Sequence, residues 1–321
     1  MTQNNVCAYL DVLGFKSYIL KDLRGALDLL NDPQSIIFSE SIERRIHPPE
    51  SYTDATLRSL AERRVLGSFD YYLPFSDSIF IQSSNPDLFV AQISTFLLRT
   101  FWVKSCVFDV PESREEPSRV TMLCLDREEG KISTRETAYW FPGLFRGGIS
   151  FGECVPVQIN SLVNSEMRPI TNLVGKAVVE AVEIVEGSAE VPRLKGPRLI
   201  CSQSFYEALS DKHERYVVKV DKGYEVLWPA FAFIEGNDVK LELINQFGSL
   251  FRPAVNLWKA YNHLDVGIHY YTFLKLVVRS ALHYFSFNHE NLRLAQEHIT
   301  TKLEEKHLQL KTGDLMGSQY T

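Results

Sequence analysis

The sequence lacks the features that define several large classes of protein. Its five cysteines are scattered, with no Cys-x-x-Cys pair, and an odd number of such thiols is typical of reduced cysteines rather than a disulfide framework or a zinc site. It also lacks a basic excess, since 34 Lys and Arg face 40 Asp and Glu for a formal net charge of -6. Because nucleic-acid binders usually carry clear positive charge, we expect no nucleic-acid partner.

Long hydrophobic runs are missing as well. The N-terminal MTQNNV has no basic stretch followed by an apolar one, so we expect no signal peptide. The most apolar late stretch, YYTFLKLVVRSALHYFSF, is interrupted by Lys275, Arg279 and His283 and is too short and too charged to cross a bilayer. These absences predict a cytoplasmic protein with no membrane partner, and its 321 residues, 45% hydrophobic, suit one large domain or a domain plus an appendage.

The sequence does contain short strand patterns that alternate with helical ones. The predicted order is strand, helix, helix, strand, strand, helix, strand, strand, helix, and then strand, helix and two strands. The glycines of LFRGGISFGECVPV are interpreted as a turn between two strands. A charged stretch at about 109–137 is predicted to be an insertion, in which VTMLCL suggests an extra strand. The order favours an α+β fold, with a mixed, mostly antiparallel sheet and helices on one face.

Two acidic residues stand at the ends of predicted strands. Asp11 closes an apolar strand, and Asp77 lies in the turn of a predicted hairpin. If these strands are neighbours, the two carboxylates repel each other unless a divalent cation lies between them. Two-metal phosphoryl chemistry uses such acids, and the backbone N–H groups at the helix start after Asp11 are suited to phosphate. Each acid taken singly is more often a turn former or a cap than a metal ligand.

Four segments in this order resemble the successive motifs of class III nucleotidyl cyclase catalytic domains. The family patterns are F-x-D-I-x-G-F, G-D-S/C, R-x-G-I-x-x-G and G-x-x-V-N-x-A, and the segments here are YLDVLGFKSYI, YYLPFSDSIFI, FRGGISFGE and LVGKAVVEAVEIVE. The resemblance covers roughly residues 5–227, without the insertion. It implies a ferredoxin-like class III cyclase fold, with a catalytic domain at 1–235 and a helical C-terminal extension at 236–321.

The resemblance also implies roles for individual residues. Two Mn²⁺ or Mg²⁺ ions would be held by the metal-binding residues Asp11, Val12 (through its carbonyl) and Asp77. The triphosphate would be bound by Leu13, Gly14, Phe15, Lys219 and Lys222. Arg146 matches the family's arginine before Gly-Ile, although a structural ion pair explains it equally well, and the two lysines also suit a solvated hairpin.

Several positions depart from the family pattern. Val179 and Glu183 stand where the family has an asparagine and an arginine that stabilise the transition state. Asn172 replaces an adenine-binding aspartate and Leu73 a lysine. An amide both donates and accepts, so Asn172 suits a pyrimidine edge, and the bulky Tyr71 and Phe75 would narrow the base pocket unless they are core residues.

These departures, together with the helical extension, resemble the bacterial Pycsar pyrimidine cyclases, which are antiphage enzymes that make cyclic UMP or cyclic CMP to switch on an effector. The resemblance implies UTP as the favoured substrate, a separate effector, and a homodimer in which Asp11 and Asp77 of one subunit meet Asn172 of the other. Two alternatives stay open: an inactive cyclase-fold module that binds a nucleotide and signals, and a purine cyclase. The C-terminal apolar positions either pack on the core or extend the dimer interface, namely Leu274, Val278, Leu282 and Phe285.

Overall fold

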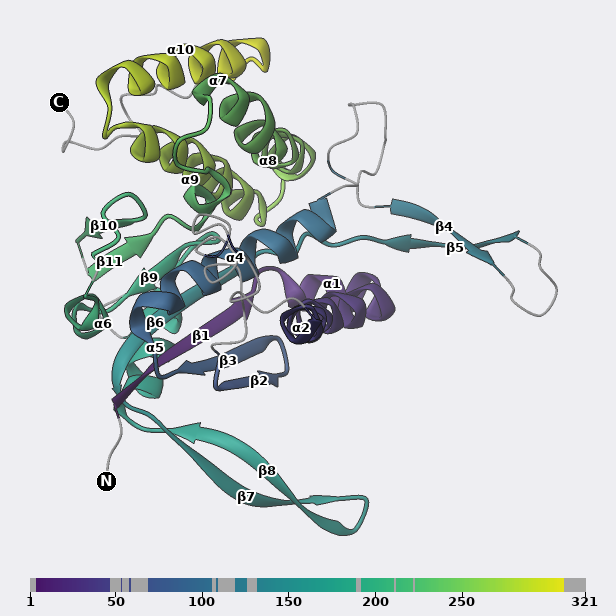
Figure 1. Cartoon of the computed structure of the whole chain (residues 1–321). Coiled ribbons are helices and arrows are strands. Elements are labelled where there is room, and N and C mark those ends of the chain that lie inside the picture. The colour runs from purple at the N-terminus through teal and green to yellow at the C-terminus, as the bar shows by residue number, and fades with distance from the viewer. Residues whose placement is uncertain are drawn as a thin grey trace.

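The computed structural model describes residues 4–46, 69–105, 119–125, 132–188, 192–210, 212–221 and 223–308, with Thr53, Arg58 and Phe108 (Figure 1). Lys222 and most of the predicted insertion lie outside the described residues. The strands are β1 (Asn4–Val12), β2 (Tyr71–Phe75), β3 (Ser78–Ser83), β4 (Arg119–Leu125), β5 (Ile132–Tyr139), β6 (Phe145–Glu153), β7 (Val155–Val163), β8 (Glu166–Val174), β9 (Leu199–Cys201), β10 (Val217–Val220) and β11 (Gly223–Val226). The helices are α1 (Phe15–Lys21), α2 (Leu23–Ile46), α4 (Pro86–Ser105), α5 (Lys176–Glu186), α6 (Gln203–Ala208), η3 (Trp228–Ala232), α7 (Val239–Glu242), η4 (Leu243–Phe247), α8 (Gly248–Tyr261), α9 (Gly267–Phe285) and α10 (His289–Glu305).

A seven-stranded sheet in the order β10-β11-β9-β6-β1-β3-β2 forms the centre of the molecule. The β6–β9 pair is parallel, and the other neighbours are antiparallel. Within it, β1, helices α1 and α2, β2, β3, α4 and β6 follow the β-α-β-β-α-β order, with the strands arranged β6-β1-β3-β2, which is ferredoxin-like. The predicted α+β fold with a mixed, mostly antiparallel sheet is therefore confirmed.

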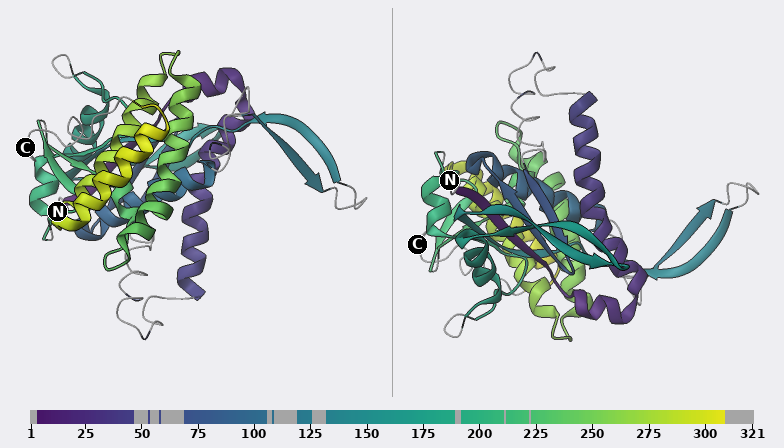
Figure 2. Two further views of the ribbon diagram at one scale, coloured as in Figure 1. Left: turned by 90° about the horizontal axis from the view of Figure 1, so that it is seen from above. Right: turned by 90° about the horizontal axis from the view of Figure 1, so that it is seen from below.

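Helices cover both faces of this sheet, so the prediction of helices on one face is wrong. Alternate β1 side chains, such as Leu10, lie in the main core with α4 and the C-terminal helices. The side chains between them, such as Tyr9, lie in a second apolar cluster with α5 on the other face. Seen from above, the C-terminal helices lie over the sheet (Figure 2). A Cβ on Gly148 of β6 would lie 2.2 Å from the Ala181 carbonyl oxygen, so a glycine is what lets α5 approach this closely.

The glycines of LFRGGISFGECVPV do not form a turn between two strands as predicted. Gly147 and Gly148 lie inside β6, which runs unbroken from Phe145 to Glu153. A Cβ on Gly147 would lie 2.5 Å from Leu10 Cδ2, on the core side, while Gly148 faces α5. The two glycines thus serve close packing on opposite faces of one strand.

A long hairpin made of β7 and β8 projects from the sheet, and the sequence analysis did not predict it (Figure 1). Its turn residues, Asn164 at φ 52° and Ser165 at φ 65°, are both left-handed, as a tight hairpin turn requires. A second hairpin pairs β4, predicted as VTMLCL, with β5. The β7–β8 hairpin exposes a set of large apolar side chains, namely Ile159, Leu162, Met167 and Ile170.

The C-terminal helices pack on the core. The apolar positions whose packing the sequence left open are all buried in the main core cluster, namely Leu274, Val278, Leu282 and Phe285. Helix α9, which carries them, lies between η3, α8 and α10. Among the helices that the structure describes, none combines the length and apolar character that a bilayer crossing would need.

Candidate functional site

Asp11 lies in a row of four side chains that runs across four strands of the sheet. Cross-strand register places Ser78 of β3 and Arg146 of β6 on either side of it, and Phe75 of β2 beyond Ser78. Register partners on one face lie about 4.5–5.5 Å apart at Cβ, so the row brings an acid, a hydroxyl, a guanidinium and an aromatic ring onto one line. The row lies on the face that α5 covers mainly over β6 and β1.

The Asp11 carboxylate, 4% exposed, is ion-paired within the chain. Arg146 Nε donates to Asp11 Oδ2 at 2.7 Å, and Arg146 Nη2 forms an ion pair with the same oxygen. Arg193 Nη2 lies 3.4 Å from that oxygen and 2.9 Å from Glu186 Oε1. Burial raises the pKa of Asp11 above its ordinary value, while the Arg146 and Arg193 charges oppose that rise. The partners of Asp11 are thus two guanidinium groups.

Asp77 lies beside the end of β1, in the turn between β2 and β3. The Val12 N–H donates to the Asp77 carbonyl oxygen at 2.9 Å, so a backbone bond holds this turn against Asp11. Ser76, at φ 55°, takes the left-handed conformation that tightens the turn. The charge of Asp77 also contributes to the raised pKa of Asp11. The structure therefore brings together Asp11, Val12 and Asp77.

The donor set of this cluster suits Mg²⁺ or Mn²⁺. Carboxylate and carbonyl oxygens are hard ligands, and Mg²⁺ typically takes one or two carboxylates and completes its shell with water and phosphate oxygens. Among the described residues, no group of three or more His, Cys, Asp or Glu could form an all-protein cage. A cation bound at Asp11 Oδ2 would displace Arg146 and Arg193, and one bound at Oδ1 would repel them, so the site fits ions that arrive with an anionic ligand.

The turn after Asp11 offers fewer free amides than expected. Leu13 and Phe15 are buried, and the Leu13 N–H donates to the Leu144 carbonyl oxygen at 3.0 Å. Gly14, at φ 79°, caps α1 in the left-handed conformation, where its missing Cβ leaves room for the Tyr18 ring. Phosphate binding by this turn would therefore rest on Gly14 and Phe15.

The candidate base-binding residues divide between two places. Phe75 is 71% exposed and belongs to the Asp11 row. Tyr71, on the same face of β2, is half-buried and packs against the second cluster. Asn172 lies in β8, opposite Val157 of the hairpin and outside the seven-stranded sheet. The structure thus brings the two aromatic residues to the Asp11 face but leaves Asn172 on the hairpin.

The remaining predicted residues do not join Asp11 in the same chain. Lys219 is exposed on the edge strand β10, which three strands separate from β1, or four spacings of about 4.8 Å each. Val179 and Glu183 of α5 are both exposed. They supply no cation, because valine is neutral and glutamate is acidic. Sequence reasoning missed Arg193, since no motif or periodicity singles out one arginine in the segment VPRLKGPRL.

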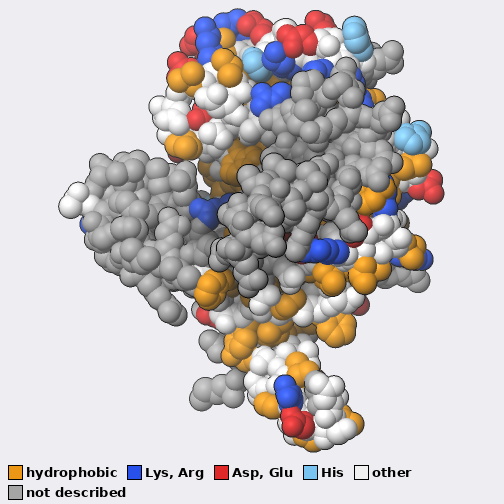
Figure 3. Space-filling model, turned by 90° about the vertical axis from the view of Figure 1, so that its right-hand side faces the viewer, with side chains coloured by type: hydrophobic (Ala, Val, Ile, Leu, Met, Phe, Trp, Pro, Cys, Tyr) orange, Lys and Arg blue, Asp and Glu red, His pale blue; other side chains and the backbone are white. Residues whose placement is uncertain are grey.

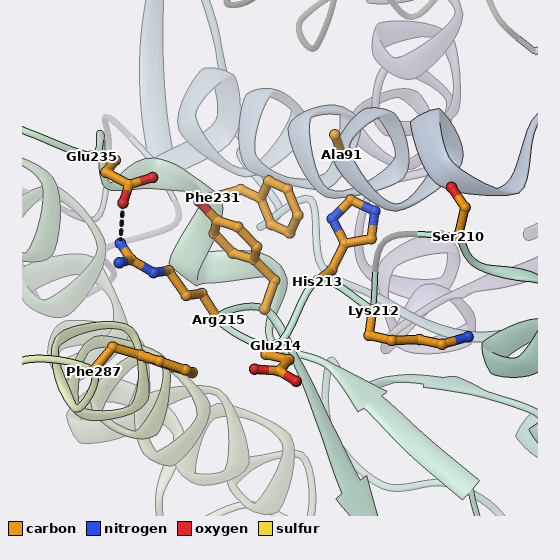
Figure 4. Close-up of a pocket in the computed structure, with 10 residues that line it drawn as sticks. Ala91, Ser210, Lys212, His213, Glu214, Arg215, Phe231, Glu235 and Phe287 are labelled. Atoms are coloured by element: carbon orange, nitrogen blue, oxygen red, sulfur yellow. Dashed lines mark ion pairs between the residues drawn. The ribbon is translucent and has the colours of Figure 1, made fainter.

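A cavity of about 480 Å³ lies elsewhere, between α4, the segment before β10 and the end of α9 (Figure 4). Its basic side chains have partners: Arg215 pairs with Glu235 at 3.0 Å, and Lys212 Nζ donates to the Tyr206 carbonyl oxygen at 2.8 Å. None of the predicted site residues lines this cavity, which is lined by Ala91, Ser210, Lys212, His213, Glu214, Arg215, Tyr216, Phe231, Glu235 and Phe287.

Comparisons with known proteins find similar structures but no sequence relatives. No protein-family model matches the sequence, and no curated protein matches it. A bacterial light-regulated adenylyl cyclase is similar at 13% identity and a TM-score of 0.36, over 66% of this chain and 81% of its own. The guanylyl cyclase Cya2 is similar at 16% identity and a TM-score of 0.37, over 70% of this chain and 90% of its own. A Trypanosoma brucei adenylate cyclase is similar at 16% identity and a TM-score of 0.39, over 74% of this chain and 93% of its own. The chemistry of the site has to be inferred from this chain's own residues.

Proposed function

We propose that the protein is a metal-dependent nucleotidyl cyclase, which converts a nucleoside triphosphate to its 3′,5′-cyclic nucleotide and pyrophosphate. The observation that carries this proposal is the backbone bond from Val12 to Asp77, which holds Asp77 beside Asp11 at the end of β1. Bound Mn²⁺ or Mg²⁺ would lower the pKa of the ribose 3′-hydroxyl and neutralise charge on the phosphates. Asp11, Asp77 and the Val12 carbonyl are the residues that would hold the ions.

The other residues of the site bind the triphosphate in this proposal. Arg146 lies beside Asp11 in register, and its planar guanidinium suits phosphate oxygens. Gly14 and Phe15 contribute backbone N–H groups. Lys219, and Lys222 near it in sequence, would reach the triphosphate only from the second subunit of a dimer. The proposed catalytic unit spans residues 1–235, and the helical extension at 236–321 stabilises it by packing against its core.

We propose a homodimer because the Asp11 face leaves apolar side chains uncovered. Phe75, which lies beyond Ser78 in the Asp11 row, is 71% exposed, and the β7–β8 hairpin exposes Leu162 at 71% and Met167 at 64%. Hydrophobic side chains gather over the lower part of the molecule, hairpin included (Figure 3). Exposed apolar groups concentrated on one side are typical of a protein interface. In such a dimer Asn172 of one subunit would approach Asp11 of the other.

The proposed substrate is a pyrimidine nucleotide, with UTP favoured over CTP. Asn172 can donate to and accept from a pyrimidine edge, and Tyr71 and Phe75 would narrow the base site. The motif resemblance to Pycsar enzymes further suggests that the cyclic nucleotide acts as a second messenger in antiphage defence, through a separate effector protein. The pyrimidine preference and the antiphage role rest on sequence features, and both require that the protein is a cyclase.

One incubation tests the reaction and the base together. The purified protein is incubated with Mn²⁺ and each of ATP, GTP, CTP and UTP, and the products are identified by mass spectrometry. Cyclic UMP or cyclic CMP is expected. Cyclic AMP or cyclic GMP would overturn the pyrimidine preference but not the cyclase reaction.

A second candidate function is an inactive cyclase-fold module that binds a nucleotide and signals by association. The observation that favours it is the exposed Val179 and Glu183, which stand where the family carries its transition-state asparagine and arginine. Failure of all four nucleotides to yield a cyclic product, together with tight binding of one of them, would support this module instead of the enzyme.

A further inference from the structure

Arg193 points from a well-anchored loop to the carboxylate of the candidate site. Residues 192–198 form the described part of the loop that leads into β9. The Leu194 N–H donates to the Val185 carbonyl oxygen at 2.9 Å, and Arg146 Nη1 donates to the Leu194 carbonyl oxygen at 3.0 Å. Arg146, the main ion-pair partner of Asp11, therefore also holds the backbone next to Arg193.

The far end of the same loop is fixed by contacts of Gly196 and Pro197. Gly196, at φ 73°, donates its N–H to His269 Nδ1 at 3.1 Å, and a Cβ there would lie 2.3 Å from Thr272 Cγ2. Trp228 Nε1 donates to the Pro197 carbonyl oxygen at 2.8 Å. The backbone directly after Arg193 is thus held at Leu194, Gly196 and Pro197, while the Arg193 side chain is 53% exposed.

Three cations converge on this end of the sheet. His269 accepts a hydrogen bond from the Gly196 N–H of the same loop. Burial lowers the pKa of His269, and the charges of Arg146, Arg193 and Lys195 lower it further. Two of the three contact Asp11 Oδ2. When a metal ion binds Asp11, Arg146 and Arg193 lose this carboxylate as a partner, although Arg193 keeps Glu186 and Arg146 keeps the Leu194 carbonyl oxygen.

Metal binding by Asp11 changes what the two arginines can contact. A cation bound at Asp11 Oδ2 would take the place of the Arg146 and Arg193 guanidinium groups, and a cation bound at Oδ1 would repel them. An unpaired buried charge is costly. A triphosphate brings negative charge together with the cations, so the arginines can move from the carboxylate to phosphate oxygens and every charge stays paired. Arg193 has the freedom to do so because its guanidinium is half-exposed.

We propose that Arg193 binds the triphosphate of the substrate, from the same subunit that supplies Asp11. The proposal rests on the proposed function and adds a residue to it, since Arg193 lies outside every motif that the sequence analysis identified. Glu186 is the competing partner: its Oε1 lies 2.9 Å from Arg193 Nη2 and holds the guanidinium while no phosphate is bound. Arg193 also places a cation on the Asp11 side of the site, whereas Val179 and Glu183 place none.

The test uses inorganic tripolyphosphate with Mn²⁺ as the probe, so that it needs no cyclisation. Isothermal titration calorimetry should show binding to the full-length protein, and Arg193→Ala should weaken it by about ten- to hundredfold, as expected for a charge-assisted hydrogen bond. Arg193→Lys should fall between the two, because an ammonium keeps the charge but not the planar fork. Glu186→Gln should bind tripolyphosphate more tightly, and the gain should vanish in the Arg193→Ala background.

Arg293→Ala is the matched control, since Arg293 is 54% exposed and pairs with Glu297, far along the chain on α10. It should bind tripolyphosphate as the wild type does. Unchanged affinity in Arg193→Ala, or no binding by the wild type, overturns the proposal. If the wild type binds tripolyphosphate in an Arg193-dependent way but forms no cyclic nucleotide, the cyclase function fails and the Arg193 assignment stands. If the wild type makes product and Arg193→Ala binds and reacts normally, only the assignment fails.

Discussion

The two faces of β1 differ in what they contact, although they belong to one nine-residue strand. On one face, Leu10 and its alternate neighbours meet α4 and the C-terminal helices in the main core. On the other, Tyr9 packs with α5 in the second cluster, and the row that contains Asp11 ends at the exposed Phe75 of β2. We call the face with Leu10 the closed face and the face with Asp11 the open face. The closed face contributes burial free energy to stability, and the open face carries the row of charged side chains.

The comparison shows that a site residue can depend on the closed face for its position and on the open face for its chemistry. Asp11 is buried because the strand that carries it is central in the sheet, with β3 on one side and β6 on the other. Its charge is tolerated because Arg146 lies opposite in register. Substitutions on the two faces should therefore separate loss of activity from loss of stability.

The largest effect is expected on the open face, from Asp77→Ala. Asp77 holds the end of β1 through its backbone carbonyl, so the substitution removes a metal-binding carboxylate but keeps the Val12 bond. Cyclic nucleotide formation should fall by about a thousandfold or more, since the charge stabilisation supplied by the ions is lost. Mass spectrometry measures the product, and circular dichroism checks that the melting curve is unchanged. Asp265→Asn, in the exposed turn before α9, is the control, and turnover of Asp77→Ala close to wild type would refute the metal assignment.

On the closed face, Leu10→Ala should cost stability instead. Leu10 is fully buried, and a leucine-to-alanine change in a packed core costs about 2–5 kcal/mol of unfolding free energy. Leu73→Ala, half-buried on the open face, should cost clearly less in the isolated subunit. Urea unfolding followed by fluorescence measures both. Equal losses for the two variants would mean that the open face is as well packed as the core.

A smaller effect is expected on assembly from Leu162→Asp. Leu162 is 71% exposed near the tip of the β7–β8 hairpin, and a charge placed there should weaken a dimer that buries it, by about tenfold or more in dissociation constant. Sedimentation velocity over a concentration series measures the change. Leu241→Asp, on α7 with 58% exposure, should leave the dimer intact. A wild type that sediments as a monomer at all concentrations contradicts the homodimer.

The smallest effect is a pH dependence of stability on the closed side. Burial lowers the pKa of His283 below its ordinary value, the bond to the Glu214 carbonyl oxygen opposes this, and Arg279 adds to it. The unfolded chain therefore binds a proton at a higher pH than the folded one. This contribution to stability is fully present above the ordinary histidine pKa of 6.5 and falls as the pH drops below it towards the lowered pKa. Urea unfolding between pH 7 and 5 should show a shallower fall in His283→Gln, and parallel curves would refute the assignment.

Much of the site could be predicted from the sequence because its main residues sit at local boundaries. Asp11 ends an apolar strand and Asp77 sits in a two-strand turn, and both features are visible within a few residues. The hairpin turn at Asn164 and Ser165 also had a signal, in alternating apolar residues around a polar pair, but it was not recognised. The glycines of β6 were misread because glycine marks a turn and a close approach equally well.

The sequence by itself determined which residues end the strands, where the long helices lie and that their apolar faces are large enough for a core, since hydrophobic spacing and turn chemistry act over a few residues. Only the tertiary structure decided which side chains meet. Arg146 reaches Asp11 across 135 positions and Arg193 across 182. Such partners depend on strand order and register, which arise from the packing of the whole sheet and leave no mark in local spacing.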